Sequence, residues 1–575
     1  MLSLAIGIGA TITIFSYINA YLLRPLPFPN GDRFTQIQPS TENFGRMSVA
    51  YANFRDWQRL NQSFESIESF RWQRFNLTGT DPPERLRTGE VSANFRTQLE
   101  VQPLRGRLFR PDDDHGSAAP TAVISQSLWQ RLYGANSKSI EQPIILDGKL
   151  HTVIGIVSDD FSYPPHNSNA PELWVPLELN ESQPNFLKQW NHAGISTVGK
   201  LKTGVSLEQA QTDSNRVAEQ LALAYPETNT GATVLVDDFK TGQTQHVRPG
   251  ILTLMAAVGC VLLIVCVNVA GLLLARAARR THELSIRSAL GARRADLVRQ
   301  LLSENLILTV LGAAGGLLGA RLGSDLLFTL IGEDSGLLQS PPILMDPRMA
   351  AFFVGVTLFS ALLFGLFPAL QSSVVKLAGA LPSGSRSATA GRNSTRLPGA
   401  LVVTQIAMAL MLLCGAGLLL HSYQHYLQAD PGYNPHGVLT MNLSLPDTVY
   451  DNDQKRQEFY RTLLRKVTAL PGVMHAGLGS TLLGNSQSSY AVEGAPHAES
   501  GQAPYAERKS ITSDFLTTMG MRLIAGRSIN DQDTLNAPRV ALVDERFAQR
   551  WWPDESPLGQ TFPIWRNRHT RRKLA

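Results

Sequence analysis

Two short stretches contain residue types that could support metal or phosphate chemistry. His282 to Ile286 reads HELSI, which begins like the H-E-x-x-H motif of zinc proteases, where two histidines four residues apart hold the metal. Ile286 stands where the second histidine is needed, so the ligand pair is incomplete. The other histidines are scattered without metal-ligand spacing. We therefore predict no metal site.

Gly194 to Leu201 reads GISTVGKL, which matches the spacing of a phosphate-binding loop as far as its lysine. Leu201 replaces the serine or threonine whose hydroxyl would ligate Mg²⁺. The stretch also alternates like a strand, and the next helix begins only after Ser206, which can cap it. The sequence therefore predicts a strand here, and a chain that does not itself hydrolyse ATP.

The remaining reactive patterns are also incomplete. No G-x-S-x-G nucleophile elbow occurs, and GLGSTLLG at Gly477 to Gly484 has the wrong glycine spacing for a dinucleotide-binding loop. Cys260, Cys266 and Cys414 all lie inside apolar runs, where cysteines are small core residues rather than a disulfide framework. We predict no catalytic residues and no cofactor, hence a protein that is not an enzyme.

Strongly apolar blocks alternate with polar ones along the 575 residues, which the mean hydropathy of −0.07 conceals. A helix that crosses a bilayer needs roughly 20 apolar residues. The first such block has neither a basic region before it nor a small-residue cleavage site after it, so we interpret it as an uncleaved anchor. The predicted spans are Met1–Leu23, Gly250–Ala275, Asn305–Ile331, Met349–Val375 and Leu397–Leu420.

The charges of the short loops orient these helices, because basic loops face the cytoplasm. Residues 276–299 contain seven arginines against two acids, and residues 376–396 contain four basic side chains and no acid. Residues 332–348 carry three acids against one arginine. Alternation then places residues 24–249, and everything after Leu420, outside the cytoplasm. Membrane orientation thus accounts for the net charge of +5, and we predict no nucleic-acid partner.

The outer segment 24–249 has the pattern of a mixed α/β domain. Short blocks at Thr121–Ser125 and His151–Val157 predict strands, and Asp147 to Lys149 (DGK) predicts a hairpin turn. Val205–Ala224 predicts a helix capped by Ser206, with its apolar residues on one side.

The chain also repeats itself. VSANFRTQLEVQPLRGRLF from residue 91 resembles ITSDFLTTMGMRLIAGRSI from residue 511, at an offset of 420 residues. Farther on, TAVISQSLWQRLYG from residue 121 resembles VALVDERFAQRWWP from residue 540, with a one-residue slip. A duplicated membrane protein with a large outer domain in each half is the simplest explanation. Aligned pairs include Phe95 and Phe515, Gly106 and Gly526, and Arg107 and Arg527.

The arginine-rich loop contains a well-specified short helix. Thr281–Leu290 is compatible with a helix, Gly291 is suited to end it, and Glu283 and Arg287 form a favourable i,i+4 pair. A solvated basic loop would suffice to set topology. A defined helix lying across the inner face would in addition suit docking on a cytoplasmic partner, as in helix-in-groove recognition.

At these residues the chain resembles a known family. RTHELSIRSALGA, Arg280 to Ala292, resembles the FtsX-like permease domain of ABC transporters of the macrolide-exporter and lipoprotein-release type. Ala5 to Pro29 resembles the first helix and its exit in duplicated "ADOP"-type permeases of that group. VIGIV from Val153 and GKLKTGVSLEQAQTD from Gly199 resemble their MacB-like periplasmic core domain.

The resemblance implies a multi-pass α-helical membrane protein with two extracytoplasmic mixed α/β domains, in the bacterial inner membrane. It further implies a separate cytoplasmic ABC ATPase as partner, together with a homodimer or a second permease. Such permeases are expected to move extracytoplasmic domains, for export or release of an envelope substrate. The ATPase-coupling helix would use Arg280, Glu283, Leu284, Ile286, Arg287, Ala289, Leu290 and Gly291.

The domain boundaries follow from these assignments. We expect a first span (1–23), a first core domain (24–249), an FtsX-like permease domain (250–375) with its coupling loop at 276–304, a cytoplasmic linker (376–396), a fifth span (397–420), an incomplete second core domain (421–562) and a basic tail (563–575). Duplicated members have basic residues before the first span and three more spans after the second outer domain, so a truncated chain is expected.

Two other functions fit the same sequence. A mechanical signalling protein would use this architecture to regulate an envelope enzyme, and a non-functional fragment would result from truncation. A transporter would have a cargo whose release depends on the protein. A signalling protein would instead activate a partner enzyme.

The topology predicts opposite labelling of two introduced cysteines. Ser383→Cys lies in a predicted inner loop and should react only after the membrane is permeabilised, whereas Ser117→Cys should react with an impermeant maleimide in intact cells. Both are placed in a background that lacks the three native cysteines. The reverse labelling pattern would overturn the topology.

Overall fold

The computed structural model describes two compact units of the chain. One, the helical unit, comprises mainly residues 1–25 and 243–429, and the other, the mixed α/β unit, comprises mainly residues 26–242 and 430–575. The described residues are 2–279, 303, 306–322, 346–374 and 396–574, apart from gaps at 27, 42–44, 80–82, 135–139, 141, 160–169, 178–186, 188–193, 246, 447–448, 481–486, 490–504, 535–536 and 564–570.

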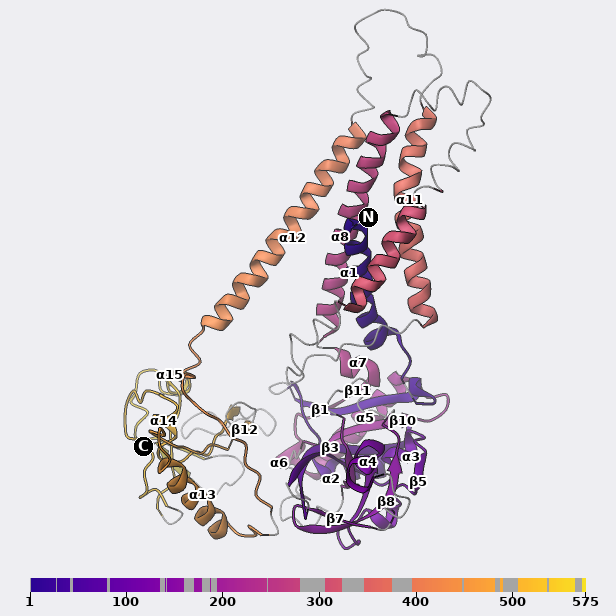
Figure 1. Ribbon diagram of the computed structural model, residues 1–575. Coiled ribbons are helices and arrows are strands. Elements are labelled where there is room, and N and C mark those ends of the chain that lie inside the picture. Colours follow the sequence, from indigo (N-terminus) through magenta and orange to yellow (C-terminus); the bar gives the residue numbers. More distant parts are fainter. Residues whose placement is uncertain are drawn as a thin grey trace, which may run out of the picture. The chain divides into compact units, whose positions relative to one another are not determined.

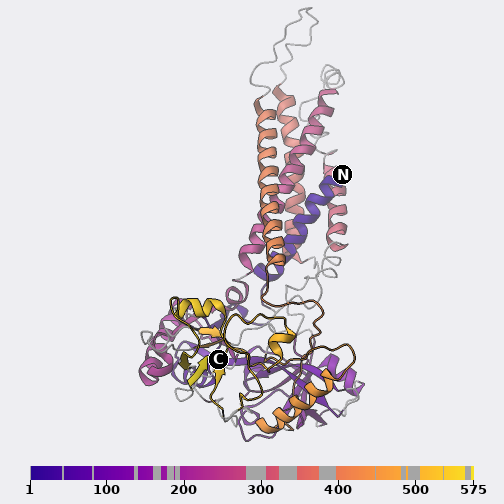
Figure 2. The same cartoon turned by 90° about the vertical axis from the view of Figure 1, so that its left-hand side faces the viewer.

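The helical unit consists of long apolar helices (Figures 1 and 2). Three are long and apolar enough to cross a membrane, at Leu2–Leu23, Arg248–Leu272 and Val402–Gln428, and two shorter apolar helices lie at Leu306–Leu322 and Pro347–Leu363. The helices are α1 (Leu2–Ile18), which continues as the π-helical turn η1 (Asn19–Leu23), α8 (Arg248–Arg279), the helix Leu306–Leu322, α11 (Pro347–Val374) and α12 (Arg396–Gln428). Of these, α8 contacts α1, α11 and α12, and α12 diverges from the others along its length (Figure 1).

The centre of this unit is the packing of α1 against three other helices. Leu4, Ile8 and Ile12 are buried among side chains of α8, Leu306–Leu322 and α11. The closest approach is glycine on glycine: a Cβ added to Gly9 would lie 2.8 Å from the carbonyl oxygen of Gly316. Small residues let helix backbones touch in this way, which is a main source of helix association in lipid.

Several polar side chains of the helical unit form hydrogen bonds within it. The hydroxyl of Thr11 donates to the carbonyl of Gly7 at 2.8 Å, within the same helix. Between helices, Gln405 of α12 donates from Nε2 to Oδ1 of Asn268 in α8 at 2.8 Å. Such internal bonds are needed in hydrocarbon, where no water can replace them.

The mixed α/β unit contains an 11-stranded sheet in the order β11-β1-β10-β3-β4-β9-β6-β8-β5, with β2 and β7 at its margins. The pairs β4–β9 and β6–β8 are parallel and the other pairs antiparallel. The strands are β1 (Phe34–Thr41), β2 (Gly45–Arg46), β3 (Phe64–Thr78), β4 (Glu84–Val91), β5 (Pro103–Gly106), β6 (Thr121–Ser125), β7 (Pro143–Leu146), β8 (Lys149–Val157), β9 (Leu173–Pro176), β10 (Ser196–Leu201) and β11 (Thr233–Asp238).

Amphipathic helices cover this sheet. Tyr51 and Phe54 of α2 and Val217 of α5 are buried against β1, β3, β10 and β11, whereas Leu128 and Trp129 of α4 are buried against β6 and β8. The helical elements are η2 (Gly31–Arg33), α2 (Tyr51–Leu60), α3 (Phe95–Gln98), η3 (Pro111–Asp113), α4 (Gln126–Tyr133), α5 (Leu207–Ala224), α6 (Pro226–Asn229) and α7 (Phe239–Thr244). The predicted fold class, a helical membrane protein with mixed α/β domains, is confirmed.

Several local predictions are confirmed as well. β6 spans Thr121–Ser125 as predicted, and the DGK turn joins β7 to β8 with φ of 47° at Asp147 and 76° at Gly148. Positive φ at both central residues gives the twist that a two-residue hairpin needs. α5 begins after Ser206, whose hydroxyl accepts from the backbone nitrogen of Gln209 in a capping box.

The C-terminal part of the chain repeats this local structure. Ser125 caps α4 through the nitrogen of Leu128, and its aligned residue Asp544 caps α15 through the nitrogen of Phe547. β14 pairs parallel with β16, and β15 pairs antiparallel with it, as β6 and β7 do with β8. The repeat is therefore confirmed. Its elements are α13 (Asp453–Thr468), β12 (Gln487–Ser489), β13 (Tyr505–Glu507), α14 (Phe515–Thr518), β14 (Val540–Ala541), α15 (Glu545–Trp551), β15 (Thr561–Pro563) and β16 (Arg571–Leu574).

The close crossing of α1 predicts a large cost for the smallest added side chain. Gly9→Ala should lower the free energy of unfolding by about 1–3 kcal/mol, since the new methyl group has to push a backbone carbonyl away. Gly259→Ala is the matched control, because a Cβ there meets nothing within 4 Å, and alanine is the better helix former. Both are measured by thermal unfolding of the detergent-solubilised chain, and equal effects would contradict the crossing.

Candidate functional site

The residues predicted to form the coupling helix, Arg280 to Gly291, lie outside the described residues. α8 is described as far as Arg279, and the next helix from Leu306. Their role as a docking helix therefore stays a prediction. The structure instead describes a polar junction at the other end of the same helices, which the sequence did not indicate.

This junction forms where α1 ends. Asn19 opens the π-helical turn η1, and the backbone nitrogen of Arg24 donates to the Asn19 carbonyl at 2.6 Å. Pro25 stops the helix, because a residue before proline is driven to extended backbone, and Arg24 has a ψ of 133°. Single π-turns inside helices are rare and often mark functional positions.

The Asn19 side chain reaches the start of α11. Its Nδ2 donates to Oδ2 of Asp346 at 2.7 Å, across 327 residues of sequence. Oδ1 of the same carboxylate accepts from the backbone nitrogen of Met349 at 2.7 Å, so Asp346 also caps α11. Both bonds lower the pKa of Asp346 below its usual range, and the bond from the Met349 nitrogen has the larger effect.

A second bond closes the junction. The guanidinium of Arg348 donates to the carbonyl of Leu23, the last residue of η1. Beneath these contacts, Ile18, Ala20 and Tyr21 pack against Ile251 and its neighbours at the start of α8. The junction thus joins the end of α1 to the beginnings of α8 and α11, as predicted for helices that alternate in direction.

The Asn19 side chain is only partly satisfied at this junction. Its hydrogen bond to a charged group contributes roughly 1.5–3 kcal/mol. Asn19 is 6% exposed, and its Oδ1 is buried without a hydrogen-bond partner among the described residues, which costs about 1–3 kcal/mol. The buried oxygen therefore offsets part of what the Asn19 bond contributes.

In the mixed α/β unit, an aromatic cluster anchors both connections to the helical unit. The ring of Phe28 lies edge-on to Phe34 at 5.2 Å and to Phe239 at 6.2 Å between centroids. Phe28 follows η1 in the chain, and Phe239 opens α7 shortly before α8. Arg33 adds an ion pair to Glu65 at 2.5 Å and donates to the carbonyl of Leu201 at 2.9 Å. A movement of α1 relative to α8 would therefore act on one buried cluster.

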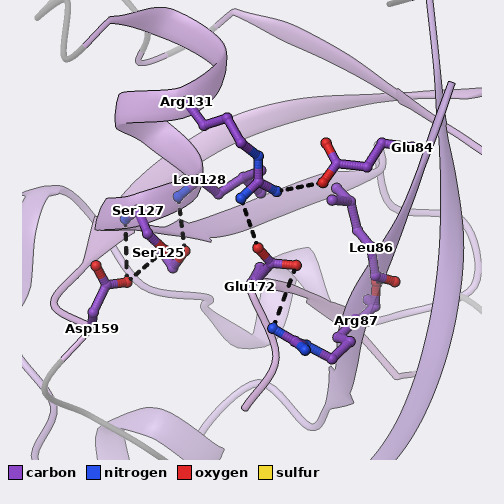
Figure 3. Close-up of polar contacts among 10 residues, drawn as sticks. Glu84, Leu86, Arg87, Ser125, Ser127, Leu128, Arg131, Asp159 and Glu172 are labelled. Carbon is purple, nitrogen blue, oxygen red and sulfur yellow. Dashed lines mark hydrogen bonds and ion pairs between the residues drawn. The ribbon is translucent and has the colours of Figure 1, made fainter. Parts of the chain in front are cut away.

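Charged contacts fix α4 to the sheet (Figure 3). Arg131 of α4 pairs with Glu84 of β4 at 2.9 Å and with Glu172, just before β9, at 3.0 Å. At the start of α4, the hydroxyls of Ser125 and Ser127 lie 3.0 Å apart, and Ser127 donates to Asp159 at 3.0 Å. These hydroxyls bond to the first turn of α4 and to Asp159, just after β8, so their role is structural.

The near match to a phosphate loop is a strand, as predicted. Ser196–Leu201 forms β10 inside the sheet, and Lys200 pairs with Glu100 at 3.4 Å and Glu65 at 3.9 Å. In a phosphate loop, backbone nitrogens surround the phosphate beside the lysine. Lys200 instead lies on a strand and pairs with two carboxylates. Among the described residues, no group of three or more histidine, cysteine or acidic side chains could hold a metal.

One polar clamp recurs in both repeats. Arg107 donates to both oxygens of Asp113, at 2.5 and 2.9 Å, and Arg527 does the same to Asp533, at 2.8 and 2.7 Å. Each arginine follows a glycine with positive φ, 72° at Gly106 and 86° at Gly526. The hydrogen bond from arginine lowers the pKa of Asp113, and that of Asp533 to about 2.

Comparison with known proteins gives two domain matches. Residues 1–217 match the MacB-like periplasmic core domain, and residues 255–375 match the FtsX-like permease C-terminal domain. The macrolide export ATP-binding/permease protein MacB of Sodalis glossinidius is 25% identical over 285 residues, which are 48% of this chain and 40% of that protein. The uncharacterized ABC transporter permease YknZ of Bacillus subtilis is 24% identical over 397 residues, 65% of this chain and 91% of YknZ.

The pyoverdine export ATP-binding/permease protein PvdT of Pseudomonas syringae pv. syringae is 25% identical over 49% of this chain and 40% of its own length. The matched part of this chain thus covers well under two thirds of the length of these exporters. Among solved structures, the periplasmic region of MacB from Actinobacillus actinomycetemcomitans is 14% identical, with a TM-score of 0.28, over 38% of this chain and 94% of that one.

The arginine clamp predicts an acid-dependent stability. Because the folded pKa of Asp113 is lowered, its contribution is present above the unfolded value of about 3.9 and is lost as the pH falls through the folded value. Asp113→Asn should therefore lower the melting temperature at pH 7 and change it little near pH 2.5. Thermal unfolding in detergent at both pH values measures this, and an equal loss at both would contradict it.

Proposed function

We propose that this chain, a member of the permeases that join a MacB-like periplasmic core domain to an FtsX-like permease domain, couples ATP hydrolysis by a separate cytoplasmic ATPase to movement of its extracytoplasmic domains. The movement serves the export or release of an envelope substrate. The chain is a multi-pass inner-membrane protein whose core domain lies outside the cytoplasm, as in its permease relatives.

The observation that carries this proposal is how the chain passes between its units. The chain passes from α1 through η1 and η2 to the strand β1, and α8 begins at Arg248, shortly after α7 ends at Thr244. Both connections begin at the Phe28–Phe239 contact in the mixed α/β unit, and both meet again at the junction of Asn19, Asp346 and Ile251 in the helical unit. Short connections anchored at both ends transmit displacement better than flexible linkers do.

We assign the energy source to another protein. The chain matches the permease domains alone, and its one near match to a phosphate loop is a sheet strand. Several relatives are ATP-binding/permease proteins, and for this chain we assign the ATP-binding part to a partner subunit.

The contact with that subunit is assigned to the loop 276–304. Within it, Glu283, Arg287 and Leu290 would provide a charged pair and an apolar residue on the short helix that the sequence predicts. A helix of this size buries too little surface to fold alone, and a groove on the ATPase would supply the missing contacts. The core domains at 24–249 and 421–562 are then the parts that the ATPase moves.

We expect single changes in this helix to uncouple the two subunits. Leu290→Asp places a charge in the proposed groove, and Arg287→Glu breaks the pair with Glu283. Each should weaken association by 30-fold or more, as expected for about 2 kcal/mol at a central contact. Co-purification and stimulated ATPase activity are measured in nanodiscs, with Ser383→Asp in the other predicted inner loop as the matched control.

Undiminished association and undiminished stimulation in both variants would contradict the coupling role. If no ATPase co-purifies with this chain, the same changes are made at the aligned positions of an intact full-length homologue. A homologue that releases no cargo but activates an envelope enzyme would favour the signalling function instead.

A further inference from the structure

The π-helical turn at Asn19–Leu23 contains one residue more than an α-helical turn. Its bond runs from the nitrogen of Arg24 to the carbonyl of Asn19, five residues back, where an α-helix would bond four residues back. If the turn closed as an α-helix, the chain beyond it would rotate by about 100°, the angle per residue of an α-helix. The chain then passes through η2 to β1, which begins at Phe34.

Both ends of this turn are held by the start of α11. Asn19, its first residue, donates to Asp346 at 2.7 Å. The carbonyl of Leu23, its last residue, accepts from Arg348. Asp346 and Arg348 flank the first residue of α11, Pro347. The turn is therefore bonded at each end to one rigid element, so α11 sets its conformation.

The Asn19 side chain is only partly satisfied at this position. It is 6% exposed, and its Oδ1 accepts no hydrogen bond from the described residues. Buried amide oxygens without a donor are uncommon and need a reason. Within α1 the backbone crossing at Gly9 and Gly316 is tight, whereas the turn that follows departs from α-helical hydrogen bonding.

We propose that the turn Asn19–Leu23 is the joint of α1, and that Asp346 is the positioning residue that holds it. Withdrawal of the start of α11 breaks the bonds to Asn19 and Leu23, and the turn closes as an α-helix and rotates the chain that enters β1. This inference rests on the proposed function and names the residues through which helix movement reaches the core domain.

The experiment exchanges the two partners. Asn19→Asp places a second carboxylate next to Asp346 and should release the joint through repulsion. Asn19→Asp combined with Asp346→Asn restores a hydrogen bond, in which the new amide at position 346 donates to the new carboxylate at position 19. Asp346→Ser keeps a good cap on α11 but is too short to reach Asn19. Thr253→Val is the matched control, because that hydroxyl bonds only within α8, to the Pro249 carbonyl at 2.8 Å.

The readout is the distance between spin labels at Ser117 and Leu254 in the full chain, in nanodiscs, in a background without the native cysteines. Asn19→Asp and Asp346→Ser should each change the ratio of two distance populations by at least tenfold without any ATPase present. The exchanged pair and Thr253→Val should match the parent chain. Deletion of Ala20, which removes the extra residue of the turn, should give the released population alone.

A parent-like distribution in Asn19→Asp and Asp346→Ser would overturn the proposal, as would an exchanged pair no different from Asn19→Asp. If Asn19→Asp fails to fold, the distance distributions of Asp346→Ser and of the Ala20 deletion decide whether the proposal holds. Adding the ATPase and ATP tests the proposed function separately: populations that respond to the exchanged charges but not to ATP would support the joint and contradict ATP-driven movement.

Discussion

Hydrocarbon offers a buried polar group nothing to bond to, and the helical unit is arranged around that constraint. Hydroxyls such as that of Thr11 donate to the carbonyl four residues earlier, and glycines at Gly9 and Gly316 let two backbones touch where side chains would otherwise be needed. Asn19 finds its partner outside its own helix. Asp346 comes from a distant part of the chain, and its bond to Asn19, together with that of Arg348 to the Leu23 carbonyl, joins the end of η1 to the start of α11.

The mixed α/β unit solves a different problem, since its polar groups can reach water. There the sheet is stabilised by buried apolar side chains from α2, α4 and α5, and charged pairs fix the elements at its margins. The clamp of Arg107 on Asp113 recurs as Arg527 on Asp533 with nearly the same geometry. A contact that survives duplication while most neighbouring residues differ is one that the local turn requires.

Sequence patterns predicted those features that depend on local chemistry. Apolar length and loop charge predicted the membrane helices, and DGK and Ser206 predicted a hairpin and a helix start. The junction could not be predicted, because Asn19 and Asp346 are 327 residues apart and neither stands out locally. Its only signals were an asparagine at the end of an uncharged run and an aspartate before a proline and an apolar helix. The coupling helix at Arg280–Gly291 lies outside the described residues and stays a prediction.

Stiffness and compliance are divided unevenly along α1, and this bears on how such a chain could transmit force. Where Leu4, Ile8 and Ile12 are buried among three helices, a displacement has to move the whole bundle. At Asn19–Leu23 the hydrogen-bond ladder is already irregular, and the bonds to α11 are few and partly offset by a buried amide oxygen. A helix that is rigid inside the membrane and yielding at its exit converts a small shift of a neighbouring helix into a rotation outside. A uniformly stiff helix would instead need to tilt as a whole, which would disturb the close crossing of Gly9 on Gly316.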